Sequence, residues 1–106
     1  MQLCLGIPWG IEESVGSLLE MERGLPDGAR WSTLAPAAAQ LPITTHALLM
    51  GGHVRVGFED NLYLAKGVLA DSNAQFVERT VQLANALQRE VATCTQARVM
   101  LGLRPR

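Results

Sequence analysis

Short apolar runs alternate with amphipathic stretches along most of the chain. Three runs have the length and the aliphatic or β-branched content of strands, and they cover residues 2–7, 31–34 and 53–58. Helical spacing, with capping and breaking residues, predicts four helices over residues 14–24, 42–50, 72–87 and 95–103. Strands that alternate with helices imply an α/β fold with a parallel sheet and right-handed crossovers.

Capping residues define several of these helix ends. Ser14 is placed to cap the first helix, and Pro42 suits the first turn of the second. Residues 72–75 and 93–96 each carry a hydroxyl residue followed three positions later by glutamine, which predicts two capping boxes. Between residues 76 and 87 apolar side chains recur on one face, so this helix is the clearest in the chain.

The composition narrows the class of protein. The chain has 106 residues, 48% of them hydrophobic, which suits one small globular domain. Its net charge is −1 and it has no basic run, so we expect no nucleic-acid partner. Its apolar stretches fall far short of the ~20 residues that span a bilayer, so we expect no membrane partner. Two cysteines without metal or redox spacing predict reduced thiols in a cytoplasmic protein.

The third strand carries charge where burial is expected. Alternation along a strand places Val54, Val56 and Phe58 on one face, and Arg55 and Glu59 on the other. An open sheet covered by helices on both faces would bury these charges at a cost. A closed parallel barrel avoids this cost, because its inner face leads to a site at the C-terminal ends of the strands.

Two adjacent carboxylates, Glu59 and Asp60, fall at that end of the strand. Arg55 lies roughly 13 Å deeper along an extended backbone, and its long side chain can reach most of the way to them. These residue types suit a catalytic site. Two structural alternatives remain open at this point: an arginine–carboxylate pair that holds the barrel closed, and a carboxylate pair that caps a loop.

The segment "GGHVRVGFEDN", continued by "LYLAKGVLADSNAQFVERTVQLANALQREVAT", strongly resembles the β-keto acid cleavage enzymes. The resemblance extends upstream through "LGIPWG", "LPDGARWS" and "AQLP", and so covers nearly the whole chain. It implies a zinc-dependent (β/α)₈ TIM barrel. It also implies an enzyme that condenses a 3-keto acid with acetyl-CoA, then cleaves the product to acetoacetate and a new acyl-CoA.

On the matching motif, the resemblance implies that Glu59 ligates zinc and that Arg55 and Asp60 are the catalytic pair, with Asp60 as general base. Two histidine ligands are expected from an N-terminal part that this chain lacks. Neither histidine of the chain suits that role. His53 precedes the third strand, at the opposite end of the barrel from Glu59, and His46 sits in a helix, so we interpret both as structural or surface groups.

A complete barrel needs about 250 residues. We therefore interpret residues 1–106 as a single C-terminal fragment of a TIM-barrel domain, roughly its last three βα units. The expected partners are a β-keto acid, acetyl-CoA, and the remaining barrel segment or further copies of the chain. Two alternatives remain: a truncated non-catalytic remnant, and a small self-associating binding module whose open strand edges pair.

Overall fold

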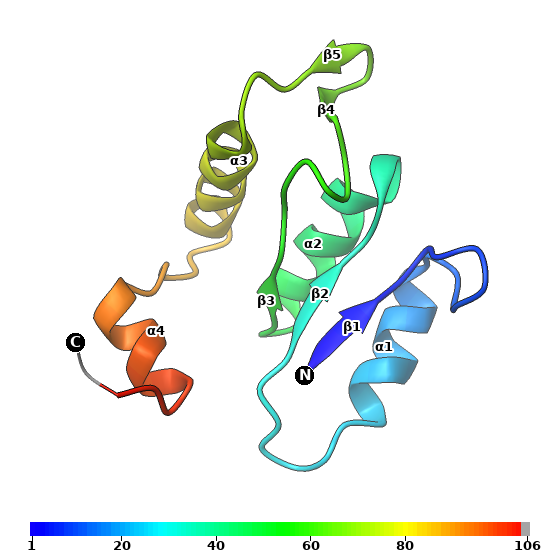
Figure 1. Cartoon of the computed structure of the whole chain (residues 1–106). Helices are drawn as coiled ribbons and strands as arrows, with labels where there is room; N and C mark the ends of the chain where they lie inside the picture. The colour runs from blue at the N-terminus through cyan, green and yellow to red at the C-terminus, as the bar shows by residue number, and fades with distance from the viewer. Residues whose placement is uncertain (105–106) are drawn as a thin grey trace.

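The computed structural model describes residues 1–104, and these form an α/β fold in which helices and parallel strands alternate over the first half (Figure 1). The elements in chain order are β1 (Gln2–Cys4), α1 (Val15–Arg23), β2 (Ser32–Leu34), η1 (Ala37–Ala39), α2 (Gln40–Leu49), β3 (His53–Val54), β4 (Tyr63–Ala65), β5 (Val68–Leu69), α3 (Asn73–Ala86) and α4 (Cys94–Met100).

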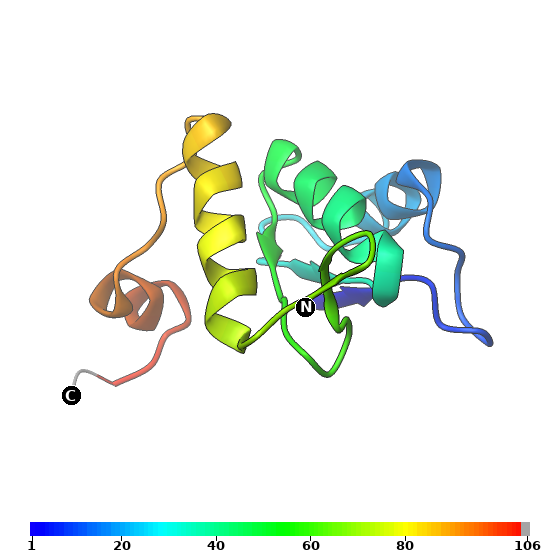
Figure 2. The ribbon, with the colours of Figure 1, turned by 90° about the horizontal axis from the view of Figure 1, so that it is seen from above.

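The central sheet is parallel, with strand order β1-β2-β3, which confirms the predicted α/β architecture. Thr33 in the middle strand pairs with Leu3 on one side and Val54 on the other. Helices α1 and α2 cover one face of this sheet (Figures 1 and 2). Side chains alternate between the two faces of a strand, so the residues that follow Leu3, Thr33 and Val54 point to the other face of the sheet. These residues are Cys4, Leu34 and Arg55.

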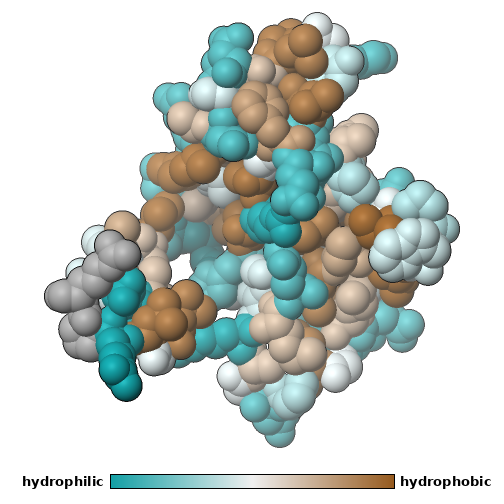
Figure 3. All heavy atoms as spheres, in the orientation of Figure 1, coloured by the Kyte–Doolittle hydropathy of each residue, from teal (hydrophilic) through white to brown (hydrophobic). Residues whose placement is uncertain are grey.

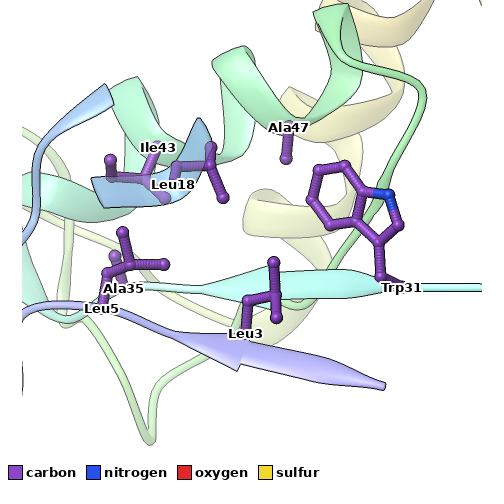
Figure 4. Packing of buried hydrophobic residues seen from close by; sticks show 7 residues of the cluster. All are labelled: Leu3, Leu5, Leu18, Trp31, Ala35, Ile43 and Ala47. Atoms are coloured by element: carbon purple, nitrogen blue, oxygen red, sulfur yellow. The ribbon is translucent and has the colours of Figure 1, made fainter. Parts of the chain in front are cut away.

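The core lies between this sheet and the two helices (Figure 4). Its buried members share one face of β1 and β2 or the inner side of α1 and α2: Leu3, Leu5, Leu18, Trp31, Ala35, Ile43 and Ala47. Gly52 is required beside it, because a Cβ atom there would lie 2.5 Å from the Trp31 ring. The first two predicted strands are therefore confirmed, and one face of each packs into the core.

Two of the three predicted helix caps are confirmed. The Ser14 hydroxyl accepts a hydrogen bond from Ser17 N–H at 3.0 Å, and Thr93 with Gln96 forms a complete capping box at α4. The capping box predicted at residues 72–75 is wrong. Gln75 Oε1 accepts instead from Asp71 N–H at 2.8 Å, and among residues 1–104 the Ser72 side chain caps nothing.

Helix α2 begins two residues earlier than predicted, at Gln40. The 3₁₀ turn η1 runs directly into it, after Ala37 takes a positive φ of 49°. Pro42 still lies in the first turn, where its missing N–H removes no intrahelical hydrogen bond. The earlier start matters for the site, because it makes Gln40 part of the helix.

The third strand is shorter than the predicted residues 53–58. Regular pairing ends at Val54, although Arg55 N–H still donates to the Thr33 carbonyl at 2.9 Å. The chain then leaves the sheet, and Phe58 N–H donates to Asn73 Oδ1 at 2.8 Å. The predicted strand is therefore wrong over residues 55–58, which lie outside the regular ladder. Phe58 packs edge-on against Phe76 instead, with ring centroids 5.7 Å apart.

Residues 59–71, for which the sequence predicted no strand or helix, contain a small antiparallel hairpin, β4 with β5. Gly67, with φ of 77°, lies in its turn, and such a conformation favours glycine. The hairpin projects away from the central sheet, beyond the N-terminal end of α3 (Figure 1).

Helix α3 lies beside β3, and α4 lies beyond α3 (Figures 1 and 2). The predicted apolar face of α3 is confirmed only in part: Phe76 and Ala84 are buried, whereas Val77 is 53% exposed. Within residues 1–104 each helix is too short or too polar to cross a bilayer. Both cysteines, Cys4 and Cys94, are free thiols.

Candidate active site

The candidate site is built where the chain leaves β3. Arg55 is the last residue there to bond to β2, and it lies on the sheet face opposite the helices. The next residues form a tight turn, in which Asp60 N–H and Asn61 N–H both donate to the Gly57 carbonyl at 3.1 Å. This turn reverses the extended path and carries the two carboxylates back toward Arg55.

The structure brings together all three residues predicted from the sequence. Arg55 Nη2 forms an ion pair with Glu59 Oε2, and Arg55 Nε lies 3.4 Å from Asp60 Oδ2. The guanidinium therefore bridges two adjacent carboxylates. The roughly 13 Å expected along an extended strand is not the relevant separation, because the turn shortens it.

The two carboxylates have different surroundings. The Glu59 side chain is 81% exposed, whereas that of Asp60 is 11% exposed and that of Arg55 is 39% exposed. An exposed ion pair contributes little to stability, so the Arg55–Glu59 pair leaves Glu59 available to other partners. Asp60 Oδ2 is buried and, among the described residues, accepts no hydrogen bond. Its partner among the described residues is therefore the guanidinium of Arg55, as an ion pair rather than a hydrogen bond.

The backbone of Asp60 is held from the end of β2. Its carbonyl accepts a hydrogen bond from Ala37 N–H at 2.7 Å. The turn after β2 and the turn after β3 therefore meet at the C-terminal ends of two neighbouring parallel strands. Catalytic residues of parallel α/β proteins gather at this end of the sheet.

Three further polar residues beside the site were missed by the sequence analysis. Gln40 is fully buried, and its Oε1 accepts from Asn61 Nδ2 at 3.3 Å and from Arg79 Nη2 at 3.1 Å. Burial lowers the pKa of the Arg79 guanidinium below its ordinary value. The asparagine that directly follows Glu59 and Asp60 was a usable signal, but the contacts of residues 40 and 79 are too distant in sequence to be read from spacing.

The metal-binding prediction has a limited basis in this chain. Within residues 1–104, no three His, Cys, Asp or Glu side chains gather closely enough to hold a metal ion. His53 is exposed at the start of β3, and His46 Nδ1 lies 2.8 Å from the Pro42 carbonyl within α2. Both agree with the structural or surface roles expected for them. Of the two carboxylates paired with Arg55, Glu59 is the exposed one, enough for one ligand position.

These features define an α/β chain with an arginine–carboxylate cluster at the C-terminal end of a parallel strand. Residues 1–103 match the model of the beta-keto acid cleavage enzyme family, and the chain belongs to that family. The resemblance stated from the sequence is thus confirmed.

Similar proteins carry related names. The chain is 46% identical over 91 residues to a 3-keto-5-aminohexanoate cleavage enzyme of Fusobacterium nucleatum, covering 86% of this chain and 34% of the relative. It is 40% identical over 99 residues to the enzyme of that name in Acetoanaerobium sticklandii, covering 93% and 36%. It is 36% identical over 106 residues to a 3-dehydrocarnitine:acetyl-CoA trimethylamine transferase of Rhizobium meliloti, covering 100% and 35%. The chain therefore spans about a third of the length of these curated relatives.

Proposed function

We propose that residues 1–106 are a single C-terminal fragment of a (β/α)₈ barrel, roughly its last three βα units, in a zinc-dependent β-keto acid cleavage enzyme. The assembled enzyme would condense a 3-keto acid with acetyl-CoA and cleave the product to acetoacetate and a new acyl-CoA. Family membership and the names of the relatives support this reaction class. The observation that carries the proposal is the cluster of Arg55, Glu59 and Asp60 at the C-terminal end of β3.

The partial barrel is supported by the shape of the sheet. Helices α1 and α2 cover one face of β1-β2-β3, as the outer ring of a barrel does (Figure 2). Arg55 lies on the other face, which would be the lumen. In the order of the described strands, β1 and β3 are the edges of this sheet, and each offers its outer side to a further strand. The partner that we propose for these edges is the remaining barrel segment.

The chemistry assigned to this chain is proton transfer and charge positioning. Asp60 is the general base, because its carboxylate is mostly shielded from water and its Oδ2 is held only by the ion pair with Arg55 within residues 1–104. Arg55 holds both carboxylates through its guanidinium and fixes their orientation. Its positive charge also suits the carboxylate of a keto acid substrate.

Glu59 fits one position of a zinc site. Its side chain is exposed, only its Oε2 is engaged by Arg55, and a carboxylate is an ordinary zinc ligand. When bound, zinc would supply Lewis-acid stabilisation of negative charge on the keto oxygen. The two histidine ligands would come from the remaining barrel segment.

The enzyme names of the relatives favour this proposal over a non-catalytic remnant or a self-associating module. A chimera tests it, in which this chain replaces the matching third of the Fusobacterium nucleatum relative. We expect the chimera to bind zinc and to form acetoacetate from a 3-keto acid and acetyl-CoA.

In that chimera, Glu59→Gln should lose zinc and activity together. Even the outer-shell partners of a metal ligand are worth about 10–100-fold in metal affinity, so replacing a ligand should remove most of the zinc. Elemental analysis after dialysis measures this loss, with Glu78→Gln on the exposed surface of α3 as the matched control. Equal zinc in wild type and Glu59→Gln would remove Glu59 from the metal site.

A further inference from the structure

A buried polar cluster lies directly behind the candidate base. Gln40, the first residue of α2, is fully buried although glutamine is usually exposed. Its Oε1 accepts two hydrogen bonds, from Asn61 and from Arg79. Its Nε2, in contrast, has no hydrogen-bond partner within residues 1–104. The side chain is therefore held through its acceptor, since both of its neighbours are donors there.

The two donors hold the segment that follows Asp60. Asn61 Oδ1 accepts from Tyr63 N–H at 2.9 Å, and Asn61 Nδ2 donates to the Tyr63 carbonyl at 2.8 Å. Arg79 Nη1 donates to the Leu64 carbonyl. The guanidinium also lies 5.3 Å from the centre of the Phe76 ring, which fixes it on α3. Gln40 thus joins α2, α3 and the start of the hairpin at one oxygen atom.

The same part of the chain also holds Asp60 itself. Ala37, three residues before Gln40, donates to the Asp60 carbonyl, and Gln40 is bonded to Asn61, the next residue. One short stretch, residues 37–40, therefore contacts both residues of the Asp60–Asn61 peptide: Ala37 bonds the Asp60 carbonyl, and Gln40 bonds the Asn61 side-chain amide. The Asp60 side chain itself lies beside Arg55, with Oδ2 3.4 Å from Nε.

We propose that Gln40 is a positioning residue for Asp60, acting through Asn61 and Arg79 by its acceptor oxygen. This inference rests on the proposed function for its effect on turnover, whereas its effect on the backbone is independent of that function. A general base must be held closely, because a displacement of about 1 Å can cost ~10²-fold in rate.

Two substitutions distinguish the effect of the Gln40 acceptor oxygen from the effect of side-chain size. Gln40→Met keeps an unbranched side chain of similar length and removes the acceptor. Gln40→Glu keeps an oxygen for each donor and replaces only Nε2, which has no partner among the described residues. Gln75→Met is the matched control, because within residues 1–104 the Gln75 side chain bonds to Asp71 and not to Asn61 or Arg79.

The first measurement is amide hydrogen exchange on the 106-residue chain. We expect Gln40→Met to speed exchange about tenfold or more at Tyr63 and Ala37, while the sheet amide of Leu5 stays within about twofold. Gln40→Glu and Gln75→Met should resemble the wild type at Tyr63 and Ala37. Wild-type exchange at both positions in Gln40→Met would overturn the proposal, and so would equal acceleration in Gln40→Glu.

The second measurement is turnover in the chimera described above. We expect Gln40→Met to lower kcat about 10–100-fold with KM changed less than about threefold, and Gln40→Glu to restore most of kcat. An unchanged kcat in Gln40→Met would overturn the role in positioning the base. Loss of turnover in the wild-type chimera, combined with the expected exchange pattern, would refute the proposed function and leave the hold on the Asp60 backbone supported.

Discussion

The two halves of the molecule differ in what they bury. Before residue 55, β1, β2 and β3 pack against α1 and α2, and nine of the eleven buried hydrophobic residues of the described chain lie there. After residue 55, Phe76 and Ala84 supply the other two, while large apolar side chains stay exposed on the hairpin and on α4, among them Leu69 at 60% and Val99 at 75% (Figure 3).

Most of the stabilising core therefore lies in the first half, and most of the candidate site lies in the second. The first half has a continuous apolar core, and apolar burial is the main source of folding free energy. The second half contributes the hairpin and the carboxylates of Glu59 and Asp60. It also contributes two members of the buried polar cluster, Asn61 and Arg79, whereas the third, Gln40, belongs to the first half. Arg55 stands at the junction, because it still bonds to β2 while its side chain holds Glu59 and Asp60.

The largest expected effect on stability comes from the core of the first half. Leu5 is fully buried, and Leu5→Ala should lower the free energy of unfolding by about 2–5 kcal/mol. Leu69→Ala on β5 should change it by less than about 0.5 kcal/mol, because that side chain is already mostly in water. Urea unfolding followed by far-UV circular dichroism measures both. Equal losses would contradict the placement of most of the buried core in the first half.

A smaller effect is expected where the halves are joined. Arg89, after α3, donates through Nη1 to the Leu48 carbonyl at the end of α2, at 2.6 Å. Arg89→Met should cost about 1.5 kcal/mol, the scale of a hydrogen bond to a charged group. Arg98→Met on α4 is the control, because within residues 1–104 its side chain bonds only to the carbonyl of Arg104. A stability change of Arg89→Met no larger than that of the control would show that this link does not couple α3 to α2.

The regular elements could be predicted because their signals are local. Ser14 and the box of Thr93 with Gln96 marked two helix starts, and apolar runs marked the strands of the parallel sheet. The early start of α2 was missed because it depends on the positive φ of Ala37, whose N–H bonds to Asp60 far along the chain. The hairpin was missed because β4 and β5 are two or three residues long and mostly exposed.

The candidate site shows the same limit. Arg55, Glu59 and Asp60 were found because one strand end carries all three, and the structure brings them together. Gln40 and Arg79 were not found, since their contact spans 39 positions and depends on how α3 packs beside the rest of the fold. Spacing along the chain can show which residues of a single strand or helix lie on the same side. It does not report a buried polar side chain whose partners come from two others.

The central claim is that Asp60, held by Arg55 and shielded from water, is the base of the reaction. The most direct test is the turnover of Asp60→Asn in the chimera with the Fusobacterium nucleatum relative, with zinc content measured on the same sample. The account predicts full zinc and a kcat lowered about 10²–10⁴-fold, the usual contribution of a general base. Asp71→Asn, an exposed carboxylate before α3, should keep normal turnover. A kcat in Asp60→Asn close to that of the wild type would contradict the account.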